Sequence, residues 1–249
     1  MAGYPKTFAA RPITLSAMNQ DLTKHMREIW IARGAIVVTA ALNAFLINDL
    51  TIFPWWLASL VELALLVPLS VATAWNHNEM RRATSEHHWT LIHHRRRKIR
   101  RAAIVLTMII TLINFQALYG VTRALLYGAK GTTGQSLLVD ALNIWLTNIV
   151  VFALWFWNID RGGPAARGLN RQPVADFLFP QMNADCPGHG TWTPGFFDYV
   201  FVSFTNATAF SPTDTLPLSV RAKLLFMVES AASLLTVGLV AARAVNILS

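Results

Sequence analysis

The apolar runs of this sequence are longer than the apolar stripes of a soluble helical domain. A run of 18 or more residues with few charges is typical of a transmembrane helix, because about 20 residues at 1.5 Å each cross the ~30 Å hydrocarbon core. Only 14% of the 249 residues are charged, against about 25% in soluble domains. The runs lie at residues 30–48, 54–75, 102–122, 137–157 and 220–248. We therefore expect an all-α, polytopic membrane protein with about five transmembrane helices.

Basic residues gather beside alternate ends of these runs, and this asymmetry predicts an orientation. The N-terminal arm up to Arg33 holds five Lys and Arg residues, and segment 76–101 holds eight. The loop between residue 157 and the short aromatic segment at 196 holds three. Beside the opposite ends lie Arg123 and Lys130. Because positive charge near helix ends is retained in the cytoplasm, we expect a multi-pass protein of the cell membrane with a cytoplasmic N-terminus.

The basic segment 76–101 contains a polybasic run, RRRKIRR, at residues 95–101. Such a run beside a membrane helix is expected to bind anionic lipid headgroups, at about 1 kcal/mol per charge. Nucleic-acid binding is the rival interpretation of a run of this kind. We discount nucleic acid as a partner because the flanking membrane helices already account for the charge.

Four histidines precede the polybasic run, and three interpretations of them remain open. They are His87, His88, His93 and His94. They can belong to a solvated cationic helix, or they can form a pH sensor, since His titrates near neutrality. A metal site is the third interpretation, but pairs six residues apart do not share a helix face, and the adjacent positive charge repels a cation. We therefore predict no metal site and no cofactor.

Four ionisable residues fall inside the apolar runs, where a charged side chain normally faces a partner or water. They are Glu62, Asp140, Glu229 and Arg243. If the helices 137–157 and 220–248 are neighbours, Asp140 and Arg243 lie at similar depths, and we expect them to form a structural salt bridge. Glu62 and Glu229 have no evident partner in the sequence, which makes them the better functional candidates.

A short aromatic segment, FFDYVFVSFTNATAFSPTDTLP at residues 196–217, lies between the last two runs. It is too short to cross a bilayer, and Ser211-Pro212 ends any helix that begins near residue 197. Asp198 lies near the start of this helix, where a carboxylate is favourable. Non-helical backbone at membrane depth is tolerated only inside protein or beside a water-filled cavity. The segment therefore predicts a re-entrant helix over residues 197–208, followed by an extended turn.

Residues 198–214, DYVFVSFTNATAFSPTD, resemble the pore helix and selectivity filter of the potassium-channel superfamily. Asp198 matches the acidic residue near the start of the family's pore helix, and Thr208 matches its last Thr. Asp214 matches the Asp that follows the filter. The segment is also similar to that of uncharacterised bacterial channel-like membrane proteins with degenerate filters. The resemblance implies that helices 137–157 and 220–248 are the outer and inner pore helices of an oligomer, with a tetramer favoured.

The sequence departs from the family where potassium would be coordinated. The filter-like residues are Thr208, Ala209, Phe210, Ser211, Pro212, Thr213 and Asp214. Ser211 and Thr213 replace the two filter glycines, which adopt backbone angles that Thr strongly disfavours. Pro212 fixes φ near −65°. A potassium-type ladder of carbonyl oxygens is therefore not expected, whereas an acidic ring of Asp214 could still attract monovalent cations, and Phe210 could form a hydrophobic constriction.

The chain is expected to divide into three parts. Residues 1–29 form a cytosolic arm, residues 30–136 form a three-helix membrane region, and residues 137–249 form the pore-like module. The charge distribution places the end of helix 137–157 in the cytoplasm, so either the count of five crossings is wrong or the short helix enters from that side, opposite to conventional potassium channels. We favour the inverted entry.

The function predicted from these features is weak or non-selective cation conduction. A non-conducting scaffold or regulatory protein with the same fold is an alternative, since a fold does not fix a function. A proton-coupled transporter that uses Glu62 or Glu229 is a third interpretation. An enzyme is not expected, because no hydrolase elbow, phosphate loop or paired-His metal motif occurs.

Overall fold

The computed structural model of the protein describes residues 15–44, 59–64, 66–67, 70–71, 86–128, 133–164, 174–183, 192–208 and 214–248. These residues are mostly helical. The long helices are α1 (Leu15–Ala44), α3 (Glu86–Tyr127), α4 (Gly134–Ile159) and α6 (Val220–Leu248), and the short helix is α5 (Phe196–Thr208). Two short strands, β1 (Phe177–Leu178) and β2 (Leu216–Pro217), and two 3₁₀ turns, Asp160–Gly162 and Pro180–Met182, complete the described elements.

Three helical segments in the described part of the chain are long and apolar enough to cross a membrane. They are Arg97–Tyr127, Gly134–Gly162 and Val220–Ala242. They contain the expected runs 102–122, 137–157 and most of 220–248. The protein is therefore a helical protein with three candidate membrane-spanning helices, which is consistent with its being embedded in a membrane.

The first two expected spans are not among these three. Residues 30–44 form the C-terminal half of α1, but Arg33 and Asn43 interrupt the apolar run, and both side chains are buried. Run 54–75 lies partly outside the described residues, which are helical at 59–64, 66–67 and 70–71. Helix α3 begins at Glu86, so the C-terminal part of the basic segment 76–101 is a helical extension of the third span.

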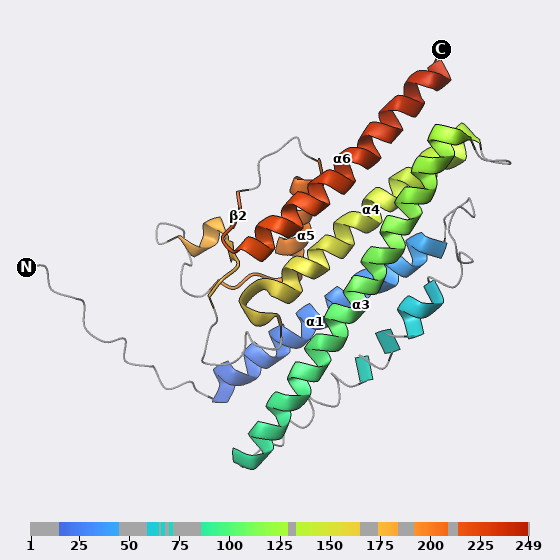
Figure 1. Ribbon diagram of the computed structural model, residues 1–249. Helices are drawn as coiled ribbons and strands as arrows, with labels where there is room; N and C mark the ends of the chain where they lie inside the picture. The colour runs from blue at the N-terminus through green and yellow to red at the C-terminus, as the bar shows by residue number, and fades with distance from the viewer. Residues whose placement is uncertain are drawn as a thin grey trace, which may run out of the picture.

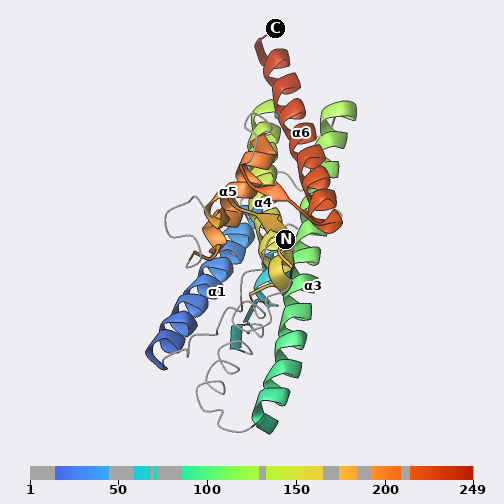
Figure 2. The same ribbon diagram turned by 90° about the vertical axis from the view of Figure 1, so that its left-hand side faces the viewer.

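Helix α4 lies at the centre of the molecule. It contacts α1, α3, α5 and α6. Of its most apolar stretch 67% is buried, against 22% of the corresponding stretch of α6. Figure 1 shows α3, α4 and α6 running side by side, with α1 crossing them and the short α5 beside α4. Figure 2 shows α5 lying between α1 and α6. The short helix is thus enclosed on one side by long helices and open on the other.

The start and the end of α4 are fixed by local backbone chemistry. Thr133 and Ser136 form a reciprocal capping box at its first turn, which satisfies two N–H groups that have no partner within the helix. At its last turn the chain reverses through Arg161, Gly162 and Gly163, which have φ angles of 51°, 79° and 82°. A Cβ atom on Gly163 would lie 2.7 Å from the Asn158 carbonyl oxygen. Only glycine fits at position 163 of this reversal.

Aromatic side chains fill the core where α4 ends. Phe156 contacts Phe177 and Phe226, with ring centroids 5.3 and 4.9 Å apart, and the Tyr199 ring lies 6.1 Å from that of Phe177. These residues come from α4, β1, α5 and α6, so one cluster joins four elements. Burial of large aromatic rings is the main apolar contribution to packing at this end.

The two strands return the chain to the end of α4 after α5. They pair antiparallel, with Phe177 opposite Pro217 and Leu178 opposite Leu216, and the Leu218 N–H donates to the Asp176 carbonyl oxygen at 2.8 Å. The residues after α5 are thereby held beside the segment that follows α4. Helix α6 then starts from this same end of the bundle.

Candidate functional site

Helix α5 runs antiparallel to α4 and lies against its C-terminal half. The Tyr199 hydroxyl donates to Asp160 Oδ2 at 2.5 Å, and the Ser203 hydroxyl lies 2.7 Å from the Ile149 carbonyl oxygen. Further along, the Phe204 ring is 6.1 Å from that of Trp145. Successive residues of α5 therefore contact successively earlier turns of α4. The helix extends from the end of α4 into the middle of the bundle.

Two acids bind the N-terminus of α5, and one of them comes from α1. Asp198 Oδ2 accepts a hydrogen bond from the Gly195 N–H at 2.7 Å, so it reaches back as the acid of a capping box does. Gly195 has no side chain to complete that box. Instead Glu28 Oε2 accepts from the Phe196 N–H at 2.6 Å. A Cβ atom on Gly195 would lie 2.9 Å from this carboxylate oxygen, so glycine is what lets α1 cap α5.

The middle of α5 is bound to α6 through a buried carboxyl group. Glu229 is 0% exposed, and its Oε1 contacts the Ser203 hydroxyl while its Oε2 accepts from Asn206 Nδ2 at 2.6 Å. Asn206 also receives a hydrogen bond from the Ser230 hydroxyl at 2.9 Å. Both carboxyl oxygens of Glu229 thus have neutral partners on the facing helix. We name Ser203, Asn206, Glu229 and Ser230 the α5–α6 polar cluster.

A second set of charged groups lies at the junction of α4, β1 and α6. Arg221 donates to both carboxylate oxygens of Asp176, from Nε at 2.7 Å and from Nη2 at 2.6 Å. Asp160 Oδ1 accepts from the Asp176 N–H at 2.8 Å. Burial acts to raise the pKa of Asp176, but the hydrogen bonds from Arg221 and Ser219 and the Arg221 charge together hold it below its usual value. This ion pair therefore stays charged over the ordinary pH range.

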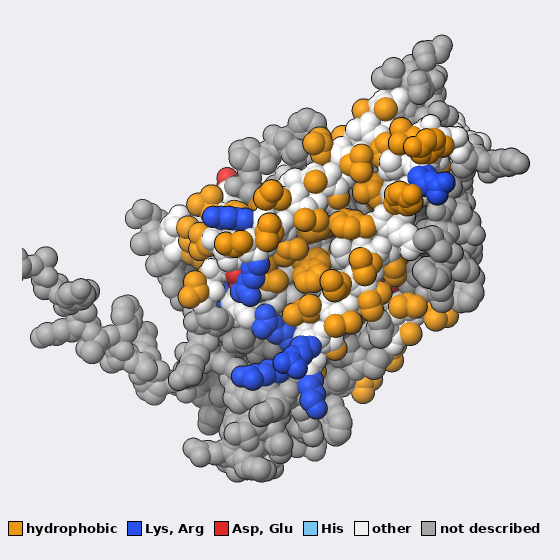
Figure 3. Space-filling view, in the orientation of Figure 1, with side chains coloured by type: hydrophobic (Ala, Val, Ile, Leu, Met, Phe, Trp, Pro, Cys, Tyr) orange, Lys and Arg blue, Asp and Glu red, His pale blue; other side chains and the backbone are white. Residues whose placement is uncertain are grey.

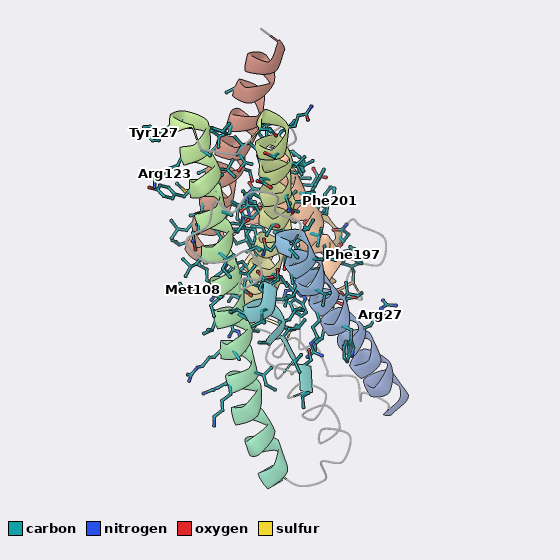
Figure 4. The ribbon with its side chains drawn as sticks, turned by 90° about the vertical axis from the view of Figure 1, so that its right-hand side faces the viewer. Arg27, Met108, Arg123, Tyr127, Phe197 and Phe201 are labelled. Carbon is teal, nitrogen blue, oxygen red and sulfur yellow. The ribbon has the colours of Figure 1, made fainter. Side chains whose placement is uncertain are left out.

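The face of α5 that points away from α4 is aromatic and open. Phe197 and Phe201 are 68% and 57% exposed, and Figure 4 shows both projecting from the bundle on the side away from Tyr127 and Arg123. They are four residues apart, which places them on one helix face. The two sides of α5 therefore differ: one is held by hydrogen bonds, and the other presents apolar rings.

The filter-like residues lie at the inner end of α5 and beyond it. Thr208 is the last residue of α5, and its hydroxyl donates to the Thr205 carbonyl oxygen at 3.0 Å. Residues 209–213 lie outside the described residues. Asp214 is exposed and lies two residues before β2. The helix at 197–208 predicted from the sequence is confirmed, with Phe196 added at its start.

The buried acids Glu62 and Glu229 bind neutral side chains and not basic ones. Glu62 is 0% exposed, and its Oε1 accepts from Asn43 Nδ2 at 2.6 Å. The sequence shows no evident partner for Glu62 or Glu229 because their partners are neutral amide and hydroxyl groups, not basic side chains. Asp140 is buried at 1% exposure. The Arg243 side chain lies outside the described ones, so the Asp140–Arg243 salt bridge stays a prediction.

The remaining predicted residues are not brought into this site by what the structure describes. His87, His88, His93 and His94 belong to the helical start of α3, but their side chains lie outside the described ones. Within the described ranges, no group of three His, Cys, Asp or Glu side chains could hold a metal ion. The sequence alone did not indicate Glu28, nor Asp160, Asp176 and Arg221 at the junction of α4, β1 and α6. Glu28 is 168 residues from its partner, and no local pattern signals such a contact.

Comparisons of the chain with protein-family models, with curated proteins and with solved structures found no match.

Proposed function

We propose that residues 134–248 form the pore module of an oligomeric, channel-like membrane protein that conducts cations weakly or without selectivity. The observation that carries this proposal is the course of the chain through α5. Helix α5 starts beside the end of α4, reaches inward as far as Trp145, and the chain returns to Asp176 at that same end. In a bilayer this course makes α5 a re-entrant helix.

The polarity of the bundle supports entry of α5 from the cytoplasmic side. The described basic residues near the ends of α4 and the starts of α3 and α6 include Arg97, Lys98, Arg161 and Lys223, whereas Arg123 lies at the opposite end of α3. Figure 3 shows the Lys and Arg side chains gathered largely along one end, with an apolar face beyond them. Positive charge of this kind is retained in the cytoplasm. The N-terminus of α5 would therefore face the cytosol.

The open surfaces of α5 and α6 support an assembly of several copies. Helix α6 exposes Leu224, Met227, Leu234 and Leu235, and α5 exposes Phe197 and Phe201. Meanwhile the buried stripe of α6 contains Glu229, Ser233 and Thr236. A tetramer would place residues 209–214 around a common axis. Asp214 would then form an acidic ring, which attracts cations to a pore entrance.

A non-conducting scaffold or regulatory protein with the same module is the second candidate. The observation that favours it is the complete engagement of Glu229, since both of its oxygens are bonded to α5. A transporter that used this acid would have to break those bonds in each cycle, so the α5–α6 polar cluster supports a structural role for Glu229 more than proton transport.

Flux measurements on reconstituted protein test the proposed conduction. The full chain is incorporated in vesicles, and uptake of monovalent cations is followed with a fluorescent indicator against vesicles without protein. We expect uptake that Asp214→Asn reduces several-fold and that Asp214→Glu retains, because only the first variant removes the acidic ring. Uptake equal to that of empty vesicles, at every cation and pH tried, would favour the scaffold.

A further inference from the structure

At the end of the bundle where the candidate spans of α3 and α6 begin, the acidic side chains are buried and several basic side chains are exposed. Asp160 and Asp176 are 0% and 2% exposed, and both are engaged in hydrogen bonds. Arg97, Arg101 and Lys223 are exposed. Figure 3 shows several Lys and Arg side chains toward this end of the bundle, with little acidic surface among them. The exposed surface at this end is therefore cationic, because its acidic side chains are buried and its basic side chains are not.

Arg100 lies at the centre of this surface, where α3 meets the end of α4. Its Nη2 is 3.5 Å from the Asn158 carbonyl oxygen, a long hydrogen bond. Its Nε is buried and has no hydrogen-bond partner among the described residues. A Cβ atom on Gly163 would lie 3.3 Å from this Nε, so the Nε packs closely against the backbone at Gly163. A buried donor without an acceptor is unfavourable.

Arg100 also lies near a second guanidinium group. Arg221 Nη2 lies 3.4 Å from the Ile159 carbonyl oxygen, next in sequence to the Asn158 carbonyl oxygen that Arg100 Nη2 approaches. Arg221 uses its Nε and Nη2 on Asp176. An anion beside the Arg221 side chain, which is 55% exposed, would offset the positive charge of both guanidinium groups. Guanidinium groups bind phosphate oxygens well, because their donors match the spacing of those oxygens.

The apolar surface beside these charges indicates where the phosphate comes from. Along α3, residues 97, 101, 105 and 108 are spaced by four, four and three, which places them on one face of the helix. Arg97 and Arg101 begin this face, and Val105 and Met108 continue it at 55% and 53% exposure. Figure 4 shows Met108 pointing away from the bundle. A cationic start followed by exposed apolar side chains fits a lipid headgroup and its acyl chains.

We propose that Arg100 and Arg221 bind the phosphate group of an anionic phospholipid, with Arg97, Arg101 and Lys223 at the rim of the site. The site extends the polybasic run 95–101 by a residue from α6. It is built from the junction of α3, α4 and α6 and does not depend on conduction. It would fix the depth at which these three helices lie in the membrane.

Lipid retention by the full-length protein tests the site. Protein purified in detergent is supplied with equal amounts of phosphatidylglycerol or phosphatidylcholine, and bound lipid is counted by native mass spectrometry. We expect phosphatidylglycerol to be retained in preference to phosphatidylcholine. Arg100→Gln should weaken retention about fivefold, which corresponds to ~1 kcal/mol for one charge near the membrane surface. Arg123→Gln, at the other end of α3, is the matched control and should retain phosphatidylglycerol fully.

A double variant and a competition with free phosphate distinguish a bound lipid from a free anion and from misfolded protein. The double variant Arg97→Gln, Arg101→Gln removes two rim charges and no described contact between helices, so it tests the site even if Arg100→Gln does not fold. It should also weaken retention. Inorganic phosphate should not displace phosphatidylglycerol, because it lacks the acyl chains. Equal retention of both lipids, displacement by inorganic phosphate, or an equal loss in Arg123→Gln would each overturn the proposal.

Discussion

Glu28 of α1 caps the first turn of α5: its Oε2 accepts a hydrogen bond from the Phe196 N–H at 2.6 Å, across 168 residues of sequence. Asp198 binds the preceding N–H from within α5. The capping function that one Ser or Thr performs in an ordinary helix is thus divided between a distant helix and the short helix itself. The N-terminal helix thereby holds the segment that we propose to form the pore.

Removing this cap should loosen α5 while the long helices remain intact. Glu28→Ala leaves the Phe196 N–H without its acceptor, which in other helices is unfavourable by about 1 kcal/mol. We expect faster hydrogen exchange in residues 196–200 and little change in α4. Mass-spectrometric hydrogen exchange on the purified protein measures both. Val38→Ala in the same helix is the control, because Val38 is 51% exposed, and equal effects of the two variants would contradict a capping role.

Two substitutions of Glu229 should separate the contribution of its hydrogen bonds from that of its carboxyl group. Hydrogen bonds between membrane helices are worth about 0.6 kcal/mol on average and up to about 1.7 kcal/mol, so Glu229→Ala, which removes two of them, should lower stability by about 1–3 kcal/mol. Glu229→Gln should be milder, since an amide can accept from Asn206 and donate to the Ser203 hydroxyl oxygen. Thermal unfolding in detergent gives the comparison. Met227→Ala, a change at a position 67% exposed on the same helix, should be nearly neutral.

The Asp176–Arg221 ion pair should give the protein an acid-sensitive junction. The pKa of Asp176 is lower in the folded protein than its usual value of about 3.9. A carboxyl group of this kind stabilises the folded state fully above pH ~4, and the contribution is lost as the pH falls through its lower folded value. We expect a component of acid unfolding below pH ~4 that Asp176→Asn removes. An unchanged acid profile in Asp176→Asn would show that other carboxyl groups control this range.

Two glycines should respond in opposite ways to the same substitution. Gly163 has a φ of 82°, and an added Cβ would lie 2.7 Å from the Asn158 carbonyl oxygen, so Gly163→Ala should destabilise by about 1–3 kcal/mol. An added Cβ on Gly238, within α6, meets no atom within 4 Å. Gly238→Ala should be neutral or stabilise by up to about 1 kcal/mol. Paired thermal unfolding curves test the contrast, and a loss of stability in Gly238→Ala would show that another copy packs against it.

The elements defined by local patterns are predictable from the sequence. The apolar runs at 102–122 and 137–157 lie within α3 and α4, and the short helix at 197–208 is α5. These elements are predictable because the length of an apolar run and the Ser211-Pro212 pair are each read from a short stretch of sequence. The first expected span is less predictable. The sequence places a boundary between an arm at 1–29 and a span at 30–48, whereas α1 is one helix from Leu15 to Ala44, since no proline or glycine pair divides it.

The contacts that build the candidate site are not predictable in the same way. The sequence offers no charged partner for Glu229, but a buried acid can be satisfied by Ser203 and Asn206, whose side chains carry no charge. Glu28 falls in the expected cytosolic arm because nothing in the sequence relates it to Phe196. These contacts depend on the packing of α1, α5 and α6 against α4. That packing is set by side chains spread over the whole chain.

The symmetry of the assembly in a lipid nanodisc, with the radius of its central axis, tests the proposed pore module most directly. Cryo-electron microscopy of the full-length protein measures both quantities. We predict a fourfold axis lined by residues 209–214, with α6 around it and the Asp214 side chains facing one another. A monomer, or an assembly whose axis lies away from α6 and residues 209–214, would contradict the proposal.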